Sequence, residues 1–363
     1  MGWTQPQENS VPALVEGIQR FDGVELDIRL TSDDHLVLHH DRRPMLLGNS
    51  LDGRPEFVEE WSLDELQNEG FDAFGDFLHH KVAQKSLSEE SKVVFVELKL
   101  PHRRLLKKKD ATSHLAKMLT KVQSIARDVG IPKHNLVVYA FYHHVDQVVK
   151  SAKYDGLWSQ LEPVIPPIEG EFWLKLRTLP SFAKTSFSSL SKKHRRSGSP
   201  IVPCALEYLS GWTRHIPLGR SVGLHGSSLK RLKKSLNGLG CHVWPCDENI
   251  ERQVLNAGLS PISDFANPEQ SLPNAARWTK PATMPLGDEE WSRLDQGILP
   301  NSSVRWSDLS DKEKIQQLEV WKMRFGWQNS TQKMLLESKG EIPWQAVRLI
   351  GHRGCGRSPR YST

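Results

Sequence analysis

The sequence has few cysteines and no long apolar run, and both absences narrow what the chain can be. Four cysteines occur in 363 residues, and none of them form a C-x-x-C pair, which favours a reduced, intracellular protein. No run approaches the roughly 18 apolar residues of a membrane-spanning helix. The opening residues MGWTQPQENSVP lack the basic and apolar regions of a signal peptide. We therefore expect a cytoplasmic protein with no transmembrane segment.

The chain also lacks a strong charge of either sign. Its formal net charge is +5 and its isoelectric point is about 8.9, with 38% hydrophobic and 25% charged residues. This mild basicity suits an anionic small-molecule substrate and is too small to indicate nucleic-acid binding. Two basic runs, KLPHRRLLKKKD and KKHRRSG, are interpreted as a solvated helix end and a mobile loop, with a surface for anionic lipid or nucleic acid as the alternative.

Short apolar strands alternate with amphipathic helices along the chain. Strand-like segments centre near residues 24, 36, 94, 137, 202, 222, 242 and 261, and helical segments such as TSHLAKMLTKVQSIARDVG lie between some of them. Such alternation predicts a parallel sheet. The count of eight strands, in which the hairpin-like pair near residues 24 and 36 supplies one or two barrel positions, predicts an α/β fold of the (β/α)8 TIM-barrel type with insertions. Residues 165–200 are rich in proline, serine and lysine, which indicates an insertion or long loop.

Two of the predicted strands carry charged residues on one face. In GVELDIRL, Glu25 and Asp27 share one face and the apolar residues share the other; in VVFVELKL, Glu97 and Lys99 do the same. A simple amphipathic strand with a wet face is the alternative for either strand alone. In a parallel barrel, however, helices cover the outer face, so the polar residues must point inward, near the mouth where active sites lie.

Three carboxylates that converge at such a mouth need a cation to stay ionised. Glu25, Asp27 and Glu97 are oxygen ligands, which suit Mg²⁺ or Ca²⁺. Lys99 would then contact a phosphate oxygen.

These segments together resemble a known family. GVELDIRLTSDDHLVLHHD is similar to the signature of glycerophosphodiester phosphodiesterases, with Glu-x-Asp on one strand and His-Asp after the next. FVELK resembles the family's next metal-ligand strand, and HVWPCDEN and GLSPISDFANP resemble the end of its barrel. The resemblance covers roughly residues 5–268.

One family element is displaced. The family opens with a strand carrying His-Arg-Gly, whereas here His352-Arg353-Gly354 lies near the C-terminus and only QPQENS stands at the front. We predict a circularly permuted single barrel: residues 1–268 form its main body, residues 269–345 connect, and residues 346–363 supply the displaced first strand. A fragment of a tandem array and a chance match are the alternatives.

The resemblance implies hydrolysis of small glycerophosphodiesters to glycerol 3-phosphate and an alcohol. It implies that His352 and His40 are the acid–base pair, and that Glu25, Asp27 and Glu97 hold a divalent ion. Arg353 offers a planar fork for phosphate oxygens. Trp244 either lines the pocket or is a core residue. A phospholipase-D-like lysolipid or sphingolipid phosphodiesterase and a non-catalytic phosphate-ester-binding barrel are the competing functions.

Overall fold

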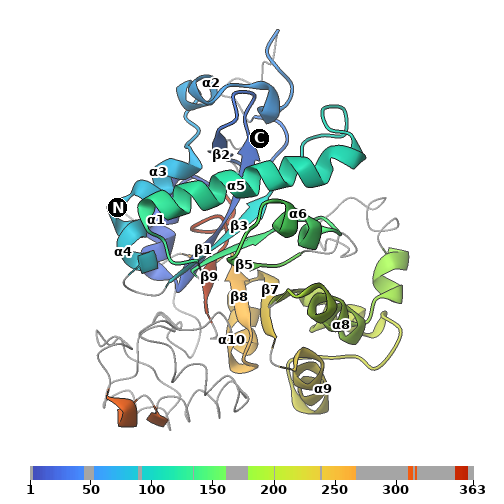
Figure 1. Ribbon diagram of the computed structural model, residues 1–363. Coiled ribbons are helices and arrows are strands. Elements are labelled where there is room, and N and C mark those ends of the chain that lie inside the picture. Colours follow the sequence, from blue (N-terminus) through green and yellow to red (C-terminus); the bar gives the residue numbers. More distant parts are fainter. Residues whose placement is uncertain are drawn as a thin grey trace.

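The protein is represented by a computed structural model, which describes residues 3–44, 53–88, 92–133, 135–160, 179–199, 201–237, 239–266, 310–313, 315–316 and 348–358 (Figure 1). No helix in these ranges is long and apolar enough to cross a membrane. The strands are β1 (Gly23–Leu30), β2 (Leu36–Leu38), β3 (Val93–Leu98), β4 (Leu136–Tyr139), β5 (Leu157–Trp158), β6 (Ile201–Ala205), β7 (Gly240–Cys246), β8 (Ser260–Ser263) and β9 (Ile350–Gly351). The α-helices are α1 (Val11–Arg20), α2 (Leu63–Asn68), α3 (Phe74–His79), α4 (Lys81–Ser88), α5 (Ala111–Val129), α6 (Val145–Ser151), α8 (Phe187–Ser197), α9 (Gly226–Leu236) and α10 (Glu248–Asn256). Short 3-10 turns lie at Val58–Glu60, Lys108–Asp110, Leu206–Tyr208 and Trp212–His215.

The parallel strands form a nearly closed ring in the order β5-β4-β3-β1-β9-β8-β7-β6. Serine side chains join the two ends of this series: Ser159 Oγ donates to the carbonyl of Ile201 at 2.9 Å, and Ser199 Oγ donates to the carbonyl of Trp158 at 3.3 Å. The predicted (β/α)8 barrel fold is thereby confirmed.

The strand expected near residue 36 is β2, which pairs antiparallel with the end of β1, so the hairpin-like pair supplies one barrel position. Two other strand expectations differ from the structure. The segment near residue 222 forms no strand; Val222 and Leu224 are buried in irregular backbone, which explains its apolar pattern. β5 was missed, because two residues cannot display a period-two pattern.

The predicted insertion at residues 165–200 is wrong for its second half, which contains helix α8. Ser186 caps this helix by accepting from the backbone N–H of Ser189. Phe187, Leu190 and His194 are buried along one face. The helix is otherwise so polar, ending in basic residues, that its sequence resembles a loop. Its basic run is thus a helix end.

Apolar side chains separate into an outer layer and a barrel interior. Val24, Leu26 and Ile28 of β1 are fully buried in a cluster that includes residues of α1, α3, α4 and α5. An equivalent outer cluster joins β6 and β7 to α8, α9 and α10. A third cluster fills the barrel itself, with Val93, Phe95, Val137, Ile201, Ile262 and Ile350 among its members. The outward faces are therefore apolar, as the barrel argument requires.

The tail strand β9 lies between β8 and β1 (Figure 1). Ile350 pairs in parallel with Gly23 on one side and with Ile262 on the other. Further bonds flank the strand: Asp22 N–H donates to the carbonyl of Leu349, and His352 N–H to that of Ser263, both at 2.9 Å. The tail thus completes this barrel. The predicted connecting segment 269–345 lies outside the described residues apart from 310–313 and 315–316.

Candidate active site

The acidic cluster sits where two neighbouring strands approach the mouth of the barrel. Asp27 of β1 lies beside Glu97 of β3 in register, and Glu25 is two residues earlier on β1. One carboxylate oxygen from each of the three lies within 4.8 Å of the other two. All three side chains are buried. They point inward because the alternate residues of each strand face the covering helices.

Several hydrogen-bond partners fix these carboxylates. Tyr139 Oη donates to Glu25 Oε1 at 2.5 Å, and Asn9 Nδ2 donates to Asp27 Oδ2 at 2.8 Å. Lys99 Nζ lies 2.9 Å from Asp27 Oδ1 and 2.6 Å from Glu97 Oε1. Lys99, which the sequence assigns to a substrate phosphate, thus bridges two acids.

Burial and mutual repulsion shift the acidity of the cluster. Burial, followed by the charges of Asp27 and Glu25, raises the pKa of Glu97 to about 7 although Lys99 opposes the change. Burial and the charge of Asp27 also raise the pKa of Glu25. Burial acts in the same direction on Asp27, but Lys99, His40 and Arg353 outweigh it and hold its pKa well below the usual range.

The charge balance of this cluster suits a divalent cation. Lys99 and Arg353 are its two fixed cations. Among the described residues they pair with cluster carboxylates and Glu8, so two negative charges are uncompensated when all four acids are ionised. Three buried oxygen donors with that excess fit Mg²⁺ or Ca²⁺ by donor type.

The turn after β9 brings His352 to this cluster. His352 Nε2 lies 3.7 Å from Glu25 Oε2, and its Nδ1 lies 2.5 Å from Asp264 Oδ1, just beyond β8. The Trp244 ring packs edge-on against this imidazole with centroids 5.5 Å apart. Trp244 therefore contacts a predicted catalytic group while also packing against the barrel core.

Arg353 is held by acids from the front of the chain. Its backbone N–H donates to Glu25 Oε2 at 3.1 Å, its guanidinium pairs with Glu8 Oε1 at 2.6 Å, and its Nε lies 3.4 Å from Asp27 Oδ2. Its φ of 48° places it in the left-handed region, and Gly354 follows with φ of 91°. A Cβ on Gly354 would lie 2.6 Å from the carbonyl of Ala13 in α1, so only glycine fits this turn.

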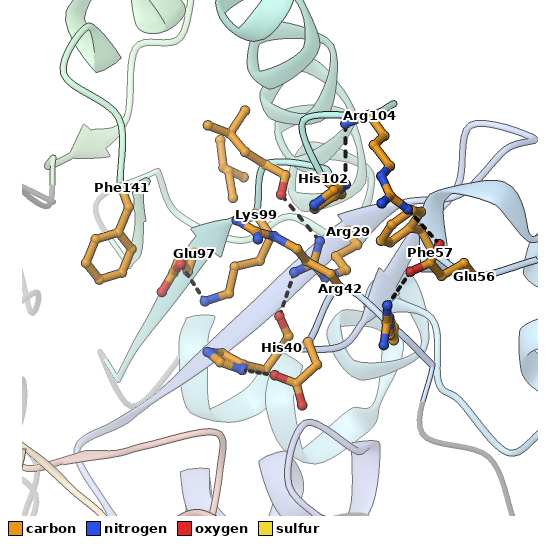
Figure 2. Close-up of a pocket in the computed structure, with 14 residues that line it drawn as sticks. Arg29, His40, Arg42, Glu56, Phe57, Glu97, Lys99, His102, Arg104 and Phe141 are labelled. Carbon is orange, nitrogen blue, oxygen red and sulfur yellow. Dashed lines mark hydrogen bonds and ion pairs between the residues drawn. The ribbon is translucent and has the colours of Figure 1, made fainter. Parts of the chain in front are cut away.

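His40 lies at the end of the β1–β2 hairpin. Its Nδ1 contacts Asp41 Oδ1 at 2.8 Å, and burial lowers its pKa although Asp27 opposes the change. Together with Glu97 and Lys99 it lines a cleft of about 820 Å³. Figure 2 shows these three side chains in the same part of the cleft. The cleft thus reaches the acidic cluster at Glu97.

The structure brings together the residues predicted for the site: Glu25, Asp27, Glu97, Lys99, His40, His352, Arg353 and Trp244. Sequence reasoning missed Asp264, Tyr139, Glu8 and Asn9. Asp264 could have been found from its position, since it follows a barrel strand directly in the SDF turn. Glu8 and Asn9 stand in the QPQENS segment that the motif comparison quotes.

A model of one protein family matches part of the chain. Residues 2–155 match the model of the Glycerophosphoryl diester phosphodiesterase family. That segment is less than half of the chain. Over it the protein is like the glycerophosphodiester phosphodiesterases, and this supports an enzyme of the phosphodiesterase class. The resemblance stated from the motifs is confirmed there. The match includes β1, β2 and β3 but not the terminal His-Arg-Gly.

Solved structures similar to the chain include a glycerophosphodiester phosphodiesterase from Thermotoga maritima, with 15% identity, 70% of this chain and 87% of that chain covered, and a TM-score of 0.43. Another, from Agrobacterium tumefaciens, has 15% identity, coverage of 70% and 89%, and a TM-score of 0.44. A phosphodiesterase from Oleispira antarctica, in complex with sn-glycerol-3-phosphate, has 13% identity, coverage of 71% and 88%, and a TM-score of 0.45. No curated protein matches the chain.

Proposed function

We propose that the protein is a metal-dependent phosphoric diester hydrolase that converts glycerophosphodiesters to glycerol 3-phosphate and an alcohol. The observation that carries the proposal is the meeting of His352, from the tail, with Glu25, from the front of the chain, at 3.7 Å. The family match over residues 2–155 supports the substrate class.

In this proposal Glu25, Asp27 and Glu97 hold the divalent ion. Such an ion neutralises phosphate oxygens and lowers the pKa of a bound hydroxyl or water. The protein's own part is to hold the three acids close together, with Lys99 limiting the repulsion between Asp27 and Glu97.

The two imidazoles share the proton transfers. Asp264 contacts His352 at Nδ1, which leaves Nε2 directed toward the acidic cluster. Asp41 contacts His40 at Nδ1 in the same way. A carboxylate that accepts from Nδ1–H fixes the tautomer whose Nε2 takes up a proton. One histidine would deprotonate the nucleophile and the other would protonate the leaving alkoxide.

The test is release of glycerol 3-phosphate from glycerophosphocholine, measured with and without EDTA. We expect EDTA to abolish the release and added Mg²⁺ or Ca²⁺ to restore it. His40→Ala should reduce turnover by about 100-fold or more, whereas His79→Ala, at an exposed position on α3, serves as the matched control. Metal-independent turnover would contradict the proposal, and binding without turnover would favour the non-catalytic barrel.

The position of β9 supports a circularly permuted origin for this barrel, which we propose as well. Moving residues 346–363 in front of Met1 would place the His-Arg-Gly strand before α1, and the rearranged chain should fold and keep its turnover. A rearranged chain that folds with no activity would contradict the permutation. Hydrogen bonds from Gln5 and Gln7 to carbonyls of residues 355–358 already join the two ends.

A further inference from the structure

The cleft extends beyond the acidic cluster. At about 820 Å³ it falls within the range of drug-sized ligand pockets. Figure 2 shows Glu97 and Lys99 toward one end, and Phe57, Glu56 and Arg104 toward the other. This second end, which we call the basic wall, consists of Arg42, Arg43, Glu56, Phe57, His102 and Arg104.

The basic wall has more positive charge than its own carboxylate can balance. Glu56 pairs with both Arg43 and Arg104. Among the described residues no ion pair involves Arg42, which is exposed and lies between Lys99 and Phe57 in the view of Figure 2. Three guanidinium groups therefore share a single acid, Glu56, at this end.

The other two cationic residues that line the cleft, Lys99 and Arg29, are already paired with carboxylates of the protein. Lys99 is bound by two carboxylates of the acidic cluster. Arg29 pairs with Glu59 at 2.6 Å with its side chain only 3% exposed, and it also donates to the carbonyl of His40 at 2.7 Å. Excess positive charge that a ligand can reach is thus confined to the basic wall.

Two stacked rings lie beside these arginines, those of the buried Phe57 and the half-buried His102. The rings of Phe57 and His102 stack with centroids 4.7 Å apart and planes 10° apart. Phe141, toward the opposite end of the cleft, is 42% exposed. Phe141 therefore offers exposed aromatic surface to a ring-sized alcohol, and the guanidinium groups lie toward the other end of the cleft.

We propose, on the basis of the proposed function, that the basic wall binds a second phosphate carried by the alcohol part of the substrate. The preferred substrates would be glycerophosphodiesters of a phosphorylated polyol. Planar guanidinium forks bind phosphate in two-pronged contacts, and the same charges disfavour a cationic choline head group. The basic run KLPHRRLLKKKD, interpreted from sequence as solvated surface, supplies His102 and Arg104 to this subsite.

The experiment compares kcat/KM for three substrates: glycerophosphocholine, glycerophosphoinositol and glycerophosphoinositol 4-phosphate. We expect the phosphorylated inositol ester to exceed the unphosphorylated one by about 10-fold or more, as a charge-assisted contact allows. The double variant Arg42→Gln, Arg104→Gln should bring this ratio close to one. Glu56→Gln should raise the ratio, because it removes the wall's own acid.

Arg54→Gln is the matched control, because Arg54 is an exposed arginine that pairs with Glu69 and does not line the cleft. Its ratio should equal that of the unaltered protein.

If the two inositol esters are hydrolysed equally well, the subsite is wrong while the proposed function stands. If no ester is hydrolysed, the proposed function is wrong. In that case calorimetric binding of inositol 4-phosphate against inositol decides on the subsite: equal or absent binding overturns it, and selective binding lost in the double variant supports it.

Discussion

The barrel can be divided into a first half, with β1, β3, β4 and β5, and a second half, with β6, β7 and β8. The two halves pack against helices in the same way but differ in the residues that point into the barrel. β1 and β3 direct Glu25, Asp27 and Glu97 into the interior beside apolar residues such as Phe95, whereas β6 and β8 direct the apolar Ile201 and Ile262 there. Both halves present apolar outer faces to their helices. Helix packing therefore constrains only the outward positions, and the inward positions of one half are free to carry charge. β9 pairs with β1 of the first half and with β8 of the second, and we call it the seam between the halves.

The largest effect should come from removing that seam. A chain that ends at Arg348 loses β9, His352 and Arg353, and it leaves the backbone groups of Asp22 and Ser263 without their partners. Each such buried group costs about 1–3 kcal/mol, so we expect loss of turnover and a much lower melting temperature. A chain that ends at Ser358 retains the described contacts and is the control. Full activity in the shorter chain would show that the tail is not part of the site.

Gly354→Ala tests whether the seam depends on the close approach of its turn to α1. The new Cβ would meet the carbonyl of Ala13 at 2.6 Å in a left-handed backbone conformation. We expect a loss of about 3 kcal/mol in the free energy of unfolding, measured by urea denaturation. Gly130→Ala has a similar φ of 78° with no atom within 4 Å, and should cost only about 1 kcal/mol. Equal losses would contradict the importance of this contact.

Two buried glutamates, one from each half, allow the effect of burial to be distinguished from a role in the site. Burial raises the pKa of both Glu97 and Glu207 to about 7. Glu97→Gln should lower kcat by about 100-fold or more and remove any thermal stabilisation by Mg²⁺. Glu207→Gln, outside the acidic cluster, should leave both readouts intact. Similar losses in the two variants would mean that the acidic cluster has no special role.

Asp264 is the clearest contribution of the second half to the site. Asp264→Asn replaces the charged acceptor at His352 Nδ1, so we expect about a 10-fold fall in kcat with little change in KM. Arg357→Gln removes the guanidinium partner of Asp264 Oδ2 and leaves the imidazole contact and the backbone N–H donor of residue 357 in place. A larger loss in the arginine variant would indicate that Asp264 serves the tail and not the histidine.

The smallest effect concerns a titrating group inside the second half. Burial, and then the charge of Arg348, lower the pKa of His242 to about 3. The unfolded chain, with a histidine pKa near 6.5, then binds more protons than the folded one between these values, so stability falls as the pH drops below about 6.5.

His242→Leu removes this titration. Denaturation at several pH values should show a decline between pH 7 and pH 5.5 that is smaller by about 1 kcal/mol than in the unaltered protein. His79→Leu, at an exposed histidine, should leave the slope unchanged. An unchanged slope in the His242 variant would mean that its imidazole is protonated in the folded state.

The sequence predicts the barrel and its acidic face because strand alternation is a local signal. Glu25 and Asp27 lie two residues apart, and helix coverage decides which way they point. The Asp264–His352 pair has no such signal, since 88 residues separate its members. Lys99 was assigned to the right cleft, but its exact partners depend on how Asp27 and Glu97 align across two strands. β5 was not predicted because it has only two residues. α8 was not predicted because its sequence is too polar to show an apolar face.

The place of β9 in the ring bears on how the protein is made. β9 follows every other described strand in order of synthesis, yet it fills the gap between the first strand and β8. Until residues 350–354 leave the ribosome, the edges of β1 and β8 that pair with β9 are open. Unpaired strand edges are prone to aggregate in newly made proteins. The acids are also still without their imidazole. Translation itself thus delays the chemistry, because the gap between β1 and β8 stays open from the synthesis of Ser263 until β9 is made.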